Sequence, residues 1–134
     1  MPAENLVVLV TGGGRGLGRA IAEYFHQNGY HVVITDYSAG LLNDLEGRDG
    51  FLVRAMDVTN RESIASVVAD IQQTLGRLDV VINNAGVIDY GPVAERDPED
   101  TVKLFQVNTF GSLRVVHACL SLLSEYQGLS LIHI

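Results

Sequence analysis

The stretch LVVLVTGGGRGLG, residues 6–18, places an apolar run directly before a cluster of glycines. The unbroken hydrophobicity of its first part is typical of a strand that is buried on both faces. Gly12, Gly16 and Gly18 follow with the spacing G-x-x-x-G-x-G, and residues 17–25 then carry apolar side chains at helical intervals. Strand, glycine turn and helix N-terminus in this order predict a phosphate site, because glycines allow close approach and the helix end favours negative charge. A glycine-rich surface loop is the alternative.

Strand and helix patterns alternate along the rest of the chain. The expected strands are residues 6–10, 31–35, 51–56 and 79–83, with 129–134 as the opening of a fifth, and the expected helices are 17–28, 38–46, 59–75 and 102–123. Alternating elements with apolar strands predict an α/β fold, a doubly wound parallel sheet of the Rossmann type. The chain is expected to be a single dinucleotide-binding domain, residues 1–134, truncated after its fourth or fifth strand.

Local signals predict where several helices begin or bend. Thr59 and Glu62 have the spacing of a capping box, in which each side chain satisfies a free backbone N–H group. Asp97 before a proline is a typical N-cap, and Ser38 is the expected cap of the short second helix. A bend is expected near Gly111 in the last helix.

Composition narrows the classes of partner. The chain has 134 residues and a net charge of −7, so nucleic acid and anionic membrane surfaces are not expected partners. Cys119 is the only cysteine, which excludes an intrachain disulfide and fits a reducing compartment. With no signal-peptide pattern at the start and no apolar run of about 20 residues, a cytoplasmic protein is expected. Neither Cys119 nor the four histidines has a metal-ligand spacing.

Asp36 supplies a second test of the phosphate-site hypothesis. It ends the second expected strand, about 18 residues after Gly18, where an acidic side chain can bind the hydroxyl groups of an adenosine ribose. A carboxylate there repels a 2′-phosphate and favours NAD over NADP. Arg15 acts in the opposite direction, since a guanidinium group could accept that phosphate. The sequence therefore predicts a nicotinamide dinucleotide as cofactor, with NAD preferred; an ordinary turn aspartate is the alternative.

Taken together, these motifs resemble the short-chain dehydrogenase/reductase family over about residues 6–123. Asp57-Val58, after the third strand, is similar to the pair that contacts adenine in that family. The Asn83–Gly86 segment matches the one that holds the sheet and borders the adenosine, and Asn108 matches the asparagine of the catalytic tetrad. Each match has a local alternative: Asp57 could only precede a helix, residues 84–86 could form a plain turn, and Asn108 could be a surface residue.

The resemblance implies a role for each matching residue. The pyrophosphate would be held by Gly12, Arg15, Gly16, Leu17 and Gly18, the ribose by Asp36 and Tyr37, the adenine by Asp57 and Val58, and the rest of the adenosine by Asn84, Ala85 and Gly86. Asn108 would hold a water in a proton relay. The implied reaction moves a hydride between nicotinamide and a small alcohol or carbonyl substrate, in a homodimer or homotetramer.

The catalytic part of the family pattern is missing. That family uses a Tyr-x-x-x-Lys motif and a serine, but Lys103 is the only lysine and Glu99 stands four residues before it. The expectation is an NAD(P)-dependent oxidoreductase fragment that keeps the cofactor site and is inactive alone. A non-catalytic dinucleotide-binding or sensing module, or a pseudoenzyme used in assembly, is the alternative.

The last residues, 129–134, carry two interpretations. Their sequence, LSLIHI, is a plausible buried strand. It is also what one frame of CTGTCTCTTATACACATC encodes, the transposase end sequence added in some sequencing library preparations. Any other codon choice in the underlying nucleotides would exclude the second interpretation.

Overall fold

The computed structural model describes residues 5–125 and 128–132. His133 and Ile134, the end of the expected fifth strand, lie outside the described residues, as does Tyr126. The elements in chain order are β1 (Val7–Val10), α1 (Gly16–Gln27), β2 (His31–Asp36), a 3₁₀ segment (Ala39–Leu45), β3 (Phe51–Ala55), α2 (Arg61–Thr74), β4 (Val80–Asn83), a 3₁₀ turn (Val93–Glu95), α3 (Pro98–Phe105), a π-helical segment (Gln106–Gly111), α4 (Ser112–Glu125) and β5 (Leu129–Ile132).

All pairings within the sheet are parallel, and the strand order is β3-β2-β1-β4-β5. Val8 of β1 pairs with Val32 of β2 on one side and with Val80 of β4 on the other. The chain first builds outward from β1 to β3 and then crosses to the other side, so the order reverses between β1 and β4. This arrangement confirms the predicted doubly wound parallel sheet and puts the switch point next to the glycine cluster.

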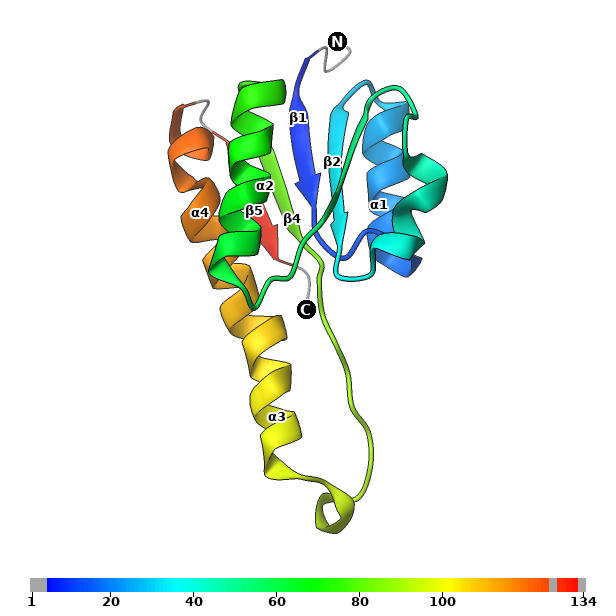
Figure 1. Ribbon diagram of the computed structural model, residues 1–134, viewed down its shortest axis with the longest axis vertical. Coiled ribbons are helices and arrows are strands. Elements are labelled where there is room, and N and C mark those ends of the chain that lie inside the picture. The colour runs from blue at the N-terminus through cyan, green and yellow to red at the C-terminus, as the bar shows by residue number, and fades with distance from the viewer. Residues whose placement is uncertain (1–4, 126–127, 133–134) are drawn as a thin grey trace.

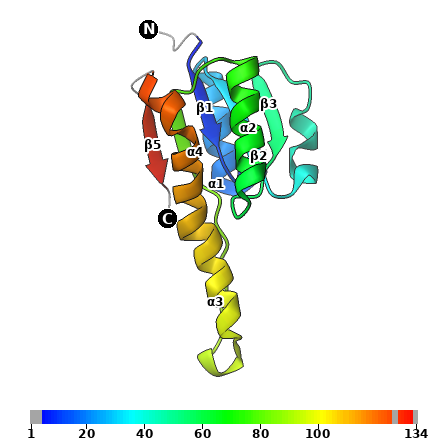
Figure 2. The same cartoon turned by 60° about the vertical axis from the view of Figure 1, so that its left-hand side comes forward.

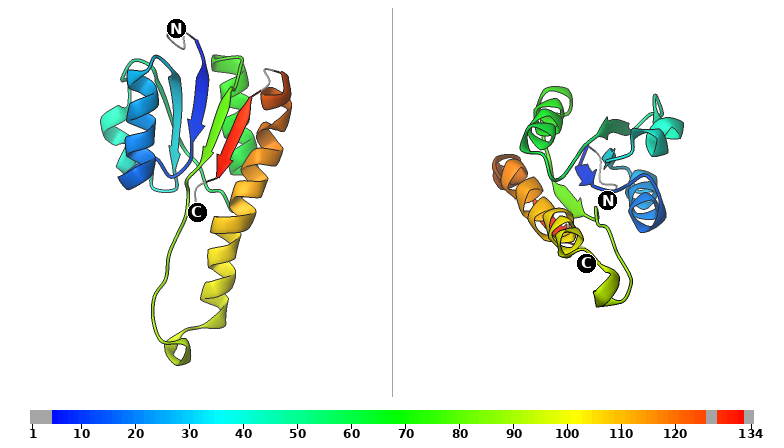
Figure 3. Two further views of the ribbon diagram at one scale, coloured as in Figure 1. Left: turned by 180° about the vertical axis from the view of Figure 1, so that it is seen from behind. Right: turned by 60° about the horizontal axis from the view of Figure 1, so that its bottom comes forward.

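Two apolar layers enclose the sheet. One layer packs α2 and α4 against it, and the other packs α1 and the 3₁₀ segment against the opposite face, as Figures 1 and 3 show. Every side chain of β1 is at most 1% exposed, because a central parallel strand is covered on both faces. The continuous hydrophobicity of this strand in the sequence therefore has a direct structural cause.

The structure corrects one predicted helix cap. The cap of α2 is Asn60, whose side-chain oxygen accepts from the backbone N–H of Ser63 at 3.0 Å. Thr59 instead donates both its N–H and its hydroxyl to the carboxylate of Asp57, at 2.9 and 2.7 Å. The predicted capping box of Thr59 and Glu62 was therefore wrong, because a nearer acceptor holds the threonine outside the helix.

The other predicted ends had mixed outcomes. Asp97 caps α3 by accepting from Glu99 N at 3.0 Å, as expected. Gly29 and Gly76 end α1 and α2 with positive φ angles of 87° and 72°. Ser38 precedes the short helix, but this helix is 3₁₀ rather than α, and the serine side chain makes no cap hydrogen bond.

Helices α3 and α4 form one long helical rod, which a π-helical segment ending at Gly111 interrupts at the place where a bend was expected. Figure 2 shows α3 extending beyond the carboxyl ends of the strands, away from the sheet. Within the described residues, no helix is long and apolar enough to cross a membrane, and no cluster of side chains is suited to a metal ion.

Candidate functional site

The glycine loop between β1 and α1 is fixed to both neighbouring strands. Thr11 N–H donates to the carbonyl of Ile82 at 3.1 Å, and Gly13 N–H donates to the carbonyl of Thr35 at 2.8 Å. Gly12 has a φ of +63°, a left-handed conformation that disfavours side chains. The loop is thus held in one shape at the carboxyl end of the sheet.

The N-terminus of α1 is free to accept an anion. Its N-cap residue, Arg15, is extended and makes no side-chain cap hydrogen bond in the described structure, whereas Asn60 and Asp97 cap α2 and α3. A Cβ added at Gly16 would meet no atom of the described residues within 4 Å, so this backbone faces open space. Uncapped N–H groups at the positive end of a twelve-residue helix are suited to a phosphate.

Asn84 locks the loop against the end of β4. Its side-chain amide donates to the carbonyls of Thr11 and Gly12, at 3.1 and 2.9 Å. A Cβ on Gly18 would lie 3.0 Å from Asn84 Cγ and closer still to its Nδ2 and to the Gly12 carbonyl oxygen. Gly18 therefore serves close packing between the helix and this amide.

Thr11 is a connecting residue that the sequence analysis did not assign to the site. Its buried hydroxyl oxygen accepts from the backbone N–H groups of Asn84 and Ala85, at 3.1 and 3.0 Å. The sheet-holding role expected of the Asn83–Gly86 segment is carried by these bonds. A threonine just before the first glycine is the sequence signal that could have identified it.

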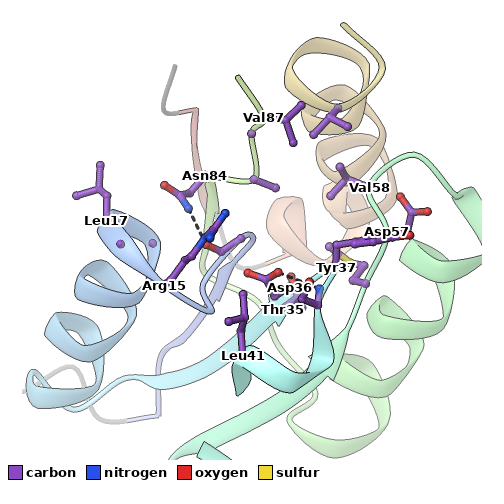
Figure 4. Close-up of a pocket in the computed structure, with 18 of the residues that line it drawn as sticks. Arg15, Leu17, Thr35, Asp36, Tyr37, Leu41, Asp57, Val58, Asn84 and Val87 are labelled. Atoms are coloured by element: carbon purple, nitrogen blue, oxygen red, sulfur yellow. Dashed lines mark hydrogen bonds between the residues drawn. The ribbon is translucent and has the colours of Figure 1, made fainter. Parts of the chain in front are cut away.

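Asp36 ties the end of β2 to the glycine loop. One carboxylate oxygen accepts from Gly14 N–H at 2.9 Å and the other from Ser38 N–H at 3.0 Å. Two carboxylate oxygens offer about four lone-pair sites, so two remain for hydroxyl donors. The carboxylate is half-buried beside the loop, where Figure 4 shows it near Leu41 and Tyr37.

A wall of the site comes from the 3₁₀ segment Ala39–Leu45, which sequence reasoning missed. A Cβ on Gly14 would lie 2.6 Å from the Cβ of Leu41, so the glycine loop packs directly on this wall. Tyr37 precedes the wall and is 78% exposed. No local pattern marks Leu41, because its role depends on where the chain returns after β2.

The far side of the site follows β3. The Asp57 carboxylate accepts from Thr59, and Val58 is buried against Gly111, where an added Cβ would lie 2.7 Å from Val58 Cγ2. The side chain of Val58 therefore packs against the π-helical segment. Tertiary packing, rather than the pair's own sequence, fixes its position.

These segments enclose one cavity of about 950 Å³ at the switch point of the sheet, drawn in Figure 4. All twelve residues predicted to bind the cofactor line it, namely Gly12, Arg15, Gly16, Leu17, Gly18, Asp36, Tyr37, Asp57, Val58, Asn84, Ala85 and Gly86. The residues not predicted are Thr35, Ser38, Gly40, Leu41, Met56, Thr59, Val87 and Val107. The structure thus gathers segments that are far apart in the sequence around one space.

Asn108 lies on the π-helical segment beside this cavity. Its side-chain oxygen accepts from Val87 N–H at 2.8 Å, and its amide nitrogen donates to the Val87 carbonyl at 2.7 Å. Val87 lines the cavity, so this pair of hydrogen bonds fixes the connection between β4 and α3 at the point where it leaves the site. Asn108 is exposed, as expected if it were a surface residue, but its side chain makes these two specific hydrogen bonds to Val87.

A parallel sheet with an uncapped helix N-terminus, a glycine turn and an acidic strand end at its switch point defines the doubly wound dinucleotide-binding class. The family model for short chain dehydrogenases matches residues 6–134. The chain belongs to the short-chain dehydrogenase family, a family of oxidoreductases that bind NAD or NADP.

Several relatives match nearly the whole chain. It is 36% identical to a cis-2,3-dihydrobiphenyl-2,3-diol dehydrogenase from Pseudomonas sp. (strain KKS102), over 96% of this chain and 49% of that protein. It is 38% identical to the enzyme of the same name from Rhodococcus globerulus, with 96% and 48% covered. A sorbitol dehydrogenase from Cereibacter sphaeroides is 33% identical, with 88% and 47% covered.

A solved structure shows the same fold. The crystal structure of a short-chain dehydrogenase from Streptomyces avermitilis superposes with a TM-score of 0.86 and 35% identity, covering 95% of this chain and 48% of that one. The chain spans about half the length of the curated relatives it matches.

Proposed function

We propose that this chain binds the adenosine and pyrophosphate part of a nicotinamide dinucleotide. The observation that carries the proposal is the cavity at the switch point of the sheet, which the glycine loop, Asp36 and residues 84–86 line together. The free N–H groups at the start of α1 would hold the pyrophosphate, and Arg15 would add a positive charge beside it. Asp57 and Val58 would border the adenine, and Tyr37 would cover the ribose.

The carboxylate of Asp36 would accept the two ribose hydroxyls with its remaining lone pairs. A 2′-phosphate would bring about two negative charges next to this carboxylate, and that repulsion supports the preference for NAD over NADP. Arg15 also lines the cavity and would moderate this preference, since its guanidinium group could pair with the 2′-phosphate.

For the intact protein we propose an oxidoreductase that acts on a small alcohol or carbonyl compound. The bound nicotinamide would supply or accept the hydride. Asn108 would serve the proton relay with the capacity left on its side chain, because its oxygen keeps one lone pair and its amide nitrogen one N–H group beside the two hydrogen bonds to Val87. The 134-residue chain alone would not turn over, since it contains Lys103 as its only lysine and no Tyr-x-x-x-Lys motif.

The second candidate is a non-catalytic module that binds the dinucleotide and senses it. The two candidates share the cofactor site and differ only in turnover. An oxidoreductase gene carries a Tyr-x-x-x-Lys motif in frame with this sequence, whereas a sensing module carries none. Sequencing the complete transcript distinguishes them.

We further propose that the intact protein assembles as a homodimer or homotetramer in the cytoplasm. Large apolar side chains remain exposed along the rod of α3 and α4, namely Val102, Phe105, Phe110, Leu113 and Leu120. A row of this kind on one rod is typical of a surface that a further protein layer covers. Size-exclusion chromatography with light scattering on the complete protein measures the state; a monomer at every concentration would contradict it.

The test of the cofactor proposal is equilibrium binding of NAD and NADP to the chain and to Asp36→Ser. The unsubstituted chain should bind NAD more tightly than NADP. Removing the carboxylate should weaken the binding of NAD. It should also reduce or invert the ratio of the NADP to the NAD dissociation constant, because the repulsion with the 2′-phosphate is gone while Arg15 remains. An equal ratio of the two dissociation constants in the unsubstituted chain and in Asp36→Ser would show that Asp36 does not set the preference for NAD over NADP.

A further inference from the structure

A network of charges links the helix behind the glycine loop to the wall of the cofactor cavity. Arg19, the residue after Gly18, donates to the carboxylate of Asp44 with both terminal nitrogens, one of them at 3.3 Å. Its Nε donates to Glu23 at 3.4 Å. Arg48 then donates to both oxygens of Glu23, at 2.8 and 3.0 Å, so one carboxylate bridges two guanidinium groups.

Asp44 lies on the same 3₁₀ segment as Leu41, the residue that packs on the glycine loop. A 3₁₀ helix has three residues per turn, so side chains three apart lie on the same edge. Leu41 and Asp44 are three apart: Leu41 lies against Gly14 of the glycine loop, and Asp44 binds Arg19 in the first turn of α1. The wall is therefore attached at two points, to the glycine loop through Leu41 and to the first turn of α1 through Asp44.

The two attachments differ in kind. The contact of Leu41 with Gly14 is apolar and lines the cavity, whereas neither Arg19 nor Asp44 belongs to the cavity lining of the described chain. Hydrogen bonding to Asp44 raises the pKa of Arg19, and hydrogen bonding to Arg48 lowers the pKa of Glu23. Both groups stay charged at neutral pH, so the network persists there.

We propose that Arg19 is a positioning residue of the dinucleotide site: by holding Asp44 it sets the distance between the 3₁₀ wall and the glycine loop. The inference rests on the proposed function, and it adds a specificity-shaping residue that does not touch the ligand. Without this tie the wall keeps its apolar packing, including the buried Leu42 and Leu45, but loses its ionic link to α1, so Leu41 would be held less firmly beside the adenosine subsite. The loss of affinity would concern the contacts with the adenosine half of the ligand, because the N–H groups that would bind the pyrophosphate remain in place.

The experiment measures the dissociation constant of ADP-ribose for the unsubstituted chain, Asp44→Asn, Arg19→Gln and the double variant. An exposed ion pair is worth up to about a five-fold change in an equilibrium constant, so we expect each single variant to weaken binding by about three- to five-fold. The double variant should be no weaker than the worse single one, because both remove the same tie.

Asp70→Asn is the matched control. Asp70 pairs with Arg54 at 2.9 Å between α2 and β3, and this ion pair, like that of Arg19 and Asp44, is partly exposed but is not tied to the 3₁₀ wall. It should leave the ADP-ribose affinity unchanged. Thermal unfolding of all variants separates the readouts, since a purely structural role of Arg19 would lower the melting temperature without changing the affinity of the folded chain.

Each outcome decides one claim. Unchanged affinity in Asp44→Asn, an equal loss in Asp70→Asn, or additive losses in the double variant would overturn the positioning role. Arg19→Lys should recover part of the affinity, because a lysine can still reach one oxygen of Asp44. Absence of ADP-ribose binding by the unsubstituted chain would overturn the proposed function itself, and the inference with it.

Discussion

Gly18→Ala should destabilise the folded chain by about 3 kcal/mol, although alanine is the better helix former. Gly18 is a buried residue in the first turn of α1. Its added Cβ would collide with the Asn84 amide and with the carbonyl oxygen of Gly12, and both belong to the lock between the loop and β4.

The magnitude follows from three contributions. Alanine gains about 1 kcal/mol over glycine in helix propensity. The collision costs about 2 kcal/mol, as overpacking in a tight interior typically does. Displacing the Asn84 amide breaks its hydrogen bonds to Thr11 and Gly12, at about 1 kcal/mol each, so the net loss is about 3 kcal/mol.

Gly40→Ala is the matched control for this substitution. Gly40 also lines the cavity, but an added Cβ there would meet no atom of the described residues within 4 Å. The free energy of unfolding of Gly40→Ala should therefore differ from that of the unsubstituted chain by less than about 0.5 kcal/mol. Urea unfolding followed by circular dichroism measures both variants, and the melting temperature of Gly18→Ala should fall by about 10 °C.

A second variant tests the assigned cause. Gly18→Ala combined with Asn84→Ala removes the amide that the new Cβ meets and leaves only the clash with the Gly12 carbonyl oxygen, so the double variant should lose less stability than the sum of the single losses. If Gly18→Ala is as stable as the unsubstituted chain, or if the two losses simply add, the packing argument for the glycine loop is refuted.

Three other substitutions test separate parts of the structure. Asn108→Ala should cost about 1 to 2 kcal/mol and speed exchange of the Val87 amide proton by about ten-fold, measured by hydrogen exchange; unchanged protection would contradict the clamp. Asp79→Ala should cost about 3 kcal/mol in urea unfolding, because its buried carboxylate accepts from Val7 N–H at 2.8 Å; a loss below about 1 kcal/mol would contradict that role. Burial raises the pKa of Cys119 from its ordinary 9.0 to about 12, so its contribution to stability is complete below pH 9 and is lost as the pH rises toward 12. In Cys119→Ala this dependence of stability on pH between 9 and 12 should disappear. A Cys119 thiol that reacts rapidly with a disulfide reagent at pH 8 in the folded chain would contradict its burial.

Much of the fold could be predicted because its signals are local. The apolar run of β1 reflects burial on both faces, and this needs no knowledge of distant residues. The positive φ angles of Gly12 and Gly16 are likewise a local property of the backbone, which glycine in the sequence signals directly. These two features were sufficient to predict the strand, the turn and the helix, and hence the place of the cavity.

Choices between equivalent polar residues could not be predicted in the same way. Thr59 and Asn60 are both good N-cap residues, and the carboxylate of Asp57 decides between them by binding the threonine first. The sequence places all three side by side without stating which hydrogen bond forms. Capping patterns therefore locate a helix start only to within a residue or so.

Partners that are distant in the sequence were missed for a related reason. Asn108 meets Val87 across 21 residues, and Arg19 meets Asp44 across 25. Each side chain by itself fits an ordinary exposed surface, and only the return of the chain past β2 or β4 brings the partner within reach. The wall residue Leu41 belongs to the same group, because its neighbour Gly14 lies on another segment.

The most direct test of the central claim is a titration of the ¹⁵N-labelled chain with ADP-ribose, followed by NMR. The amide signals of Gly16, Leu17 and Gly18 should shift together and saturate, together with those of Asp36 and Val58 across the cavity. These are the backbone groups that would hold the pyrophosphate and the adenosine. An unchanged spectrum at millimolar ligand, or shifts confined to α3 and α4, would contradict the assignment of the cavity as a dinucleotide site.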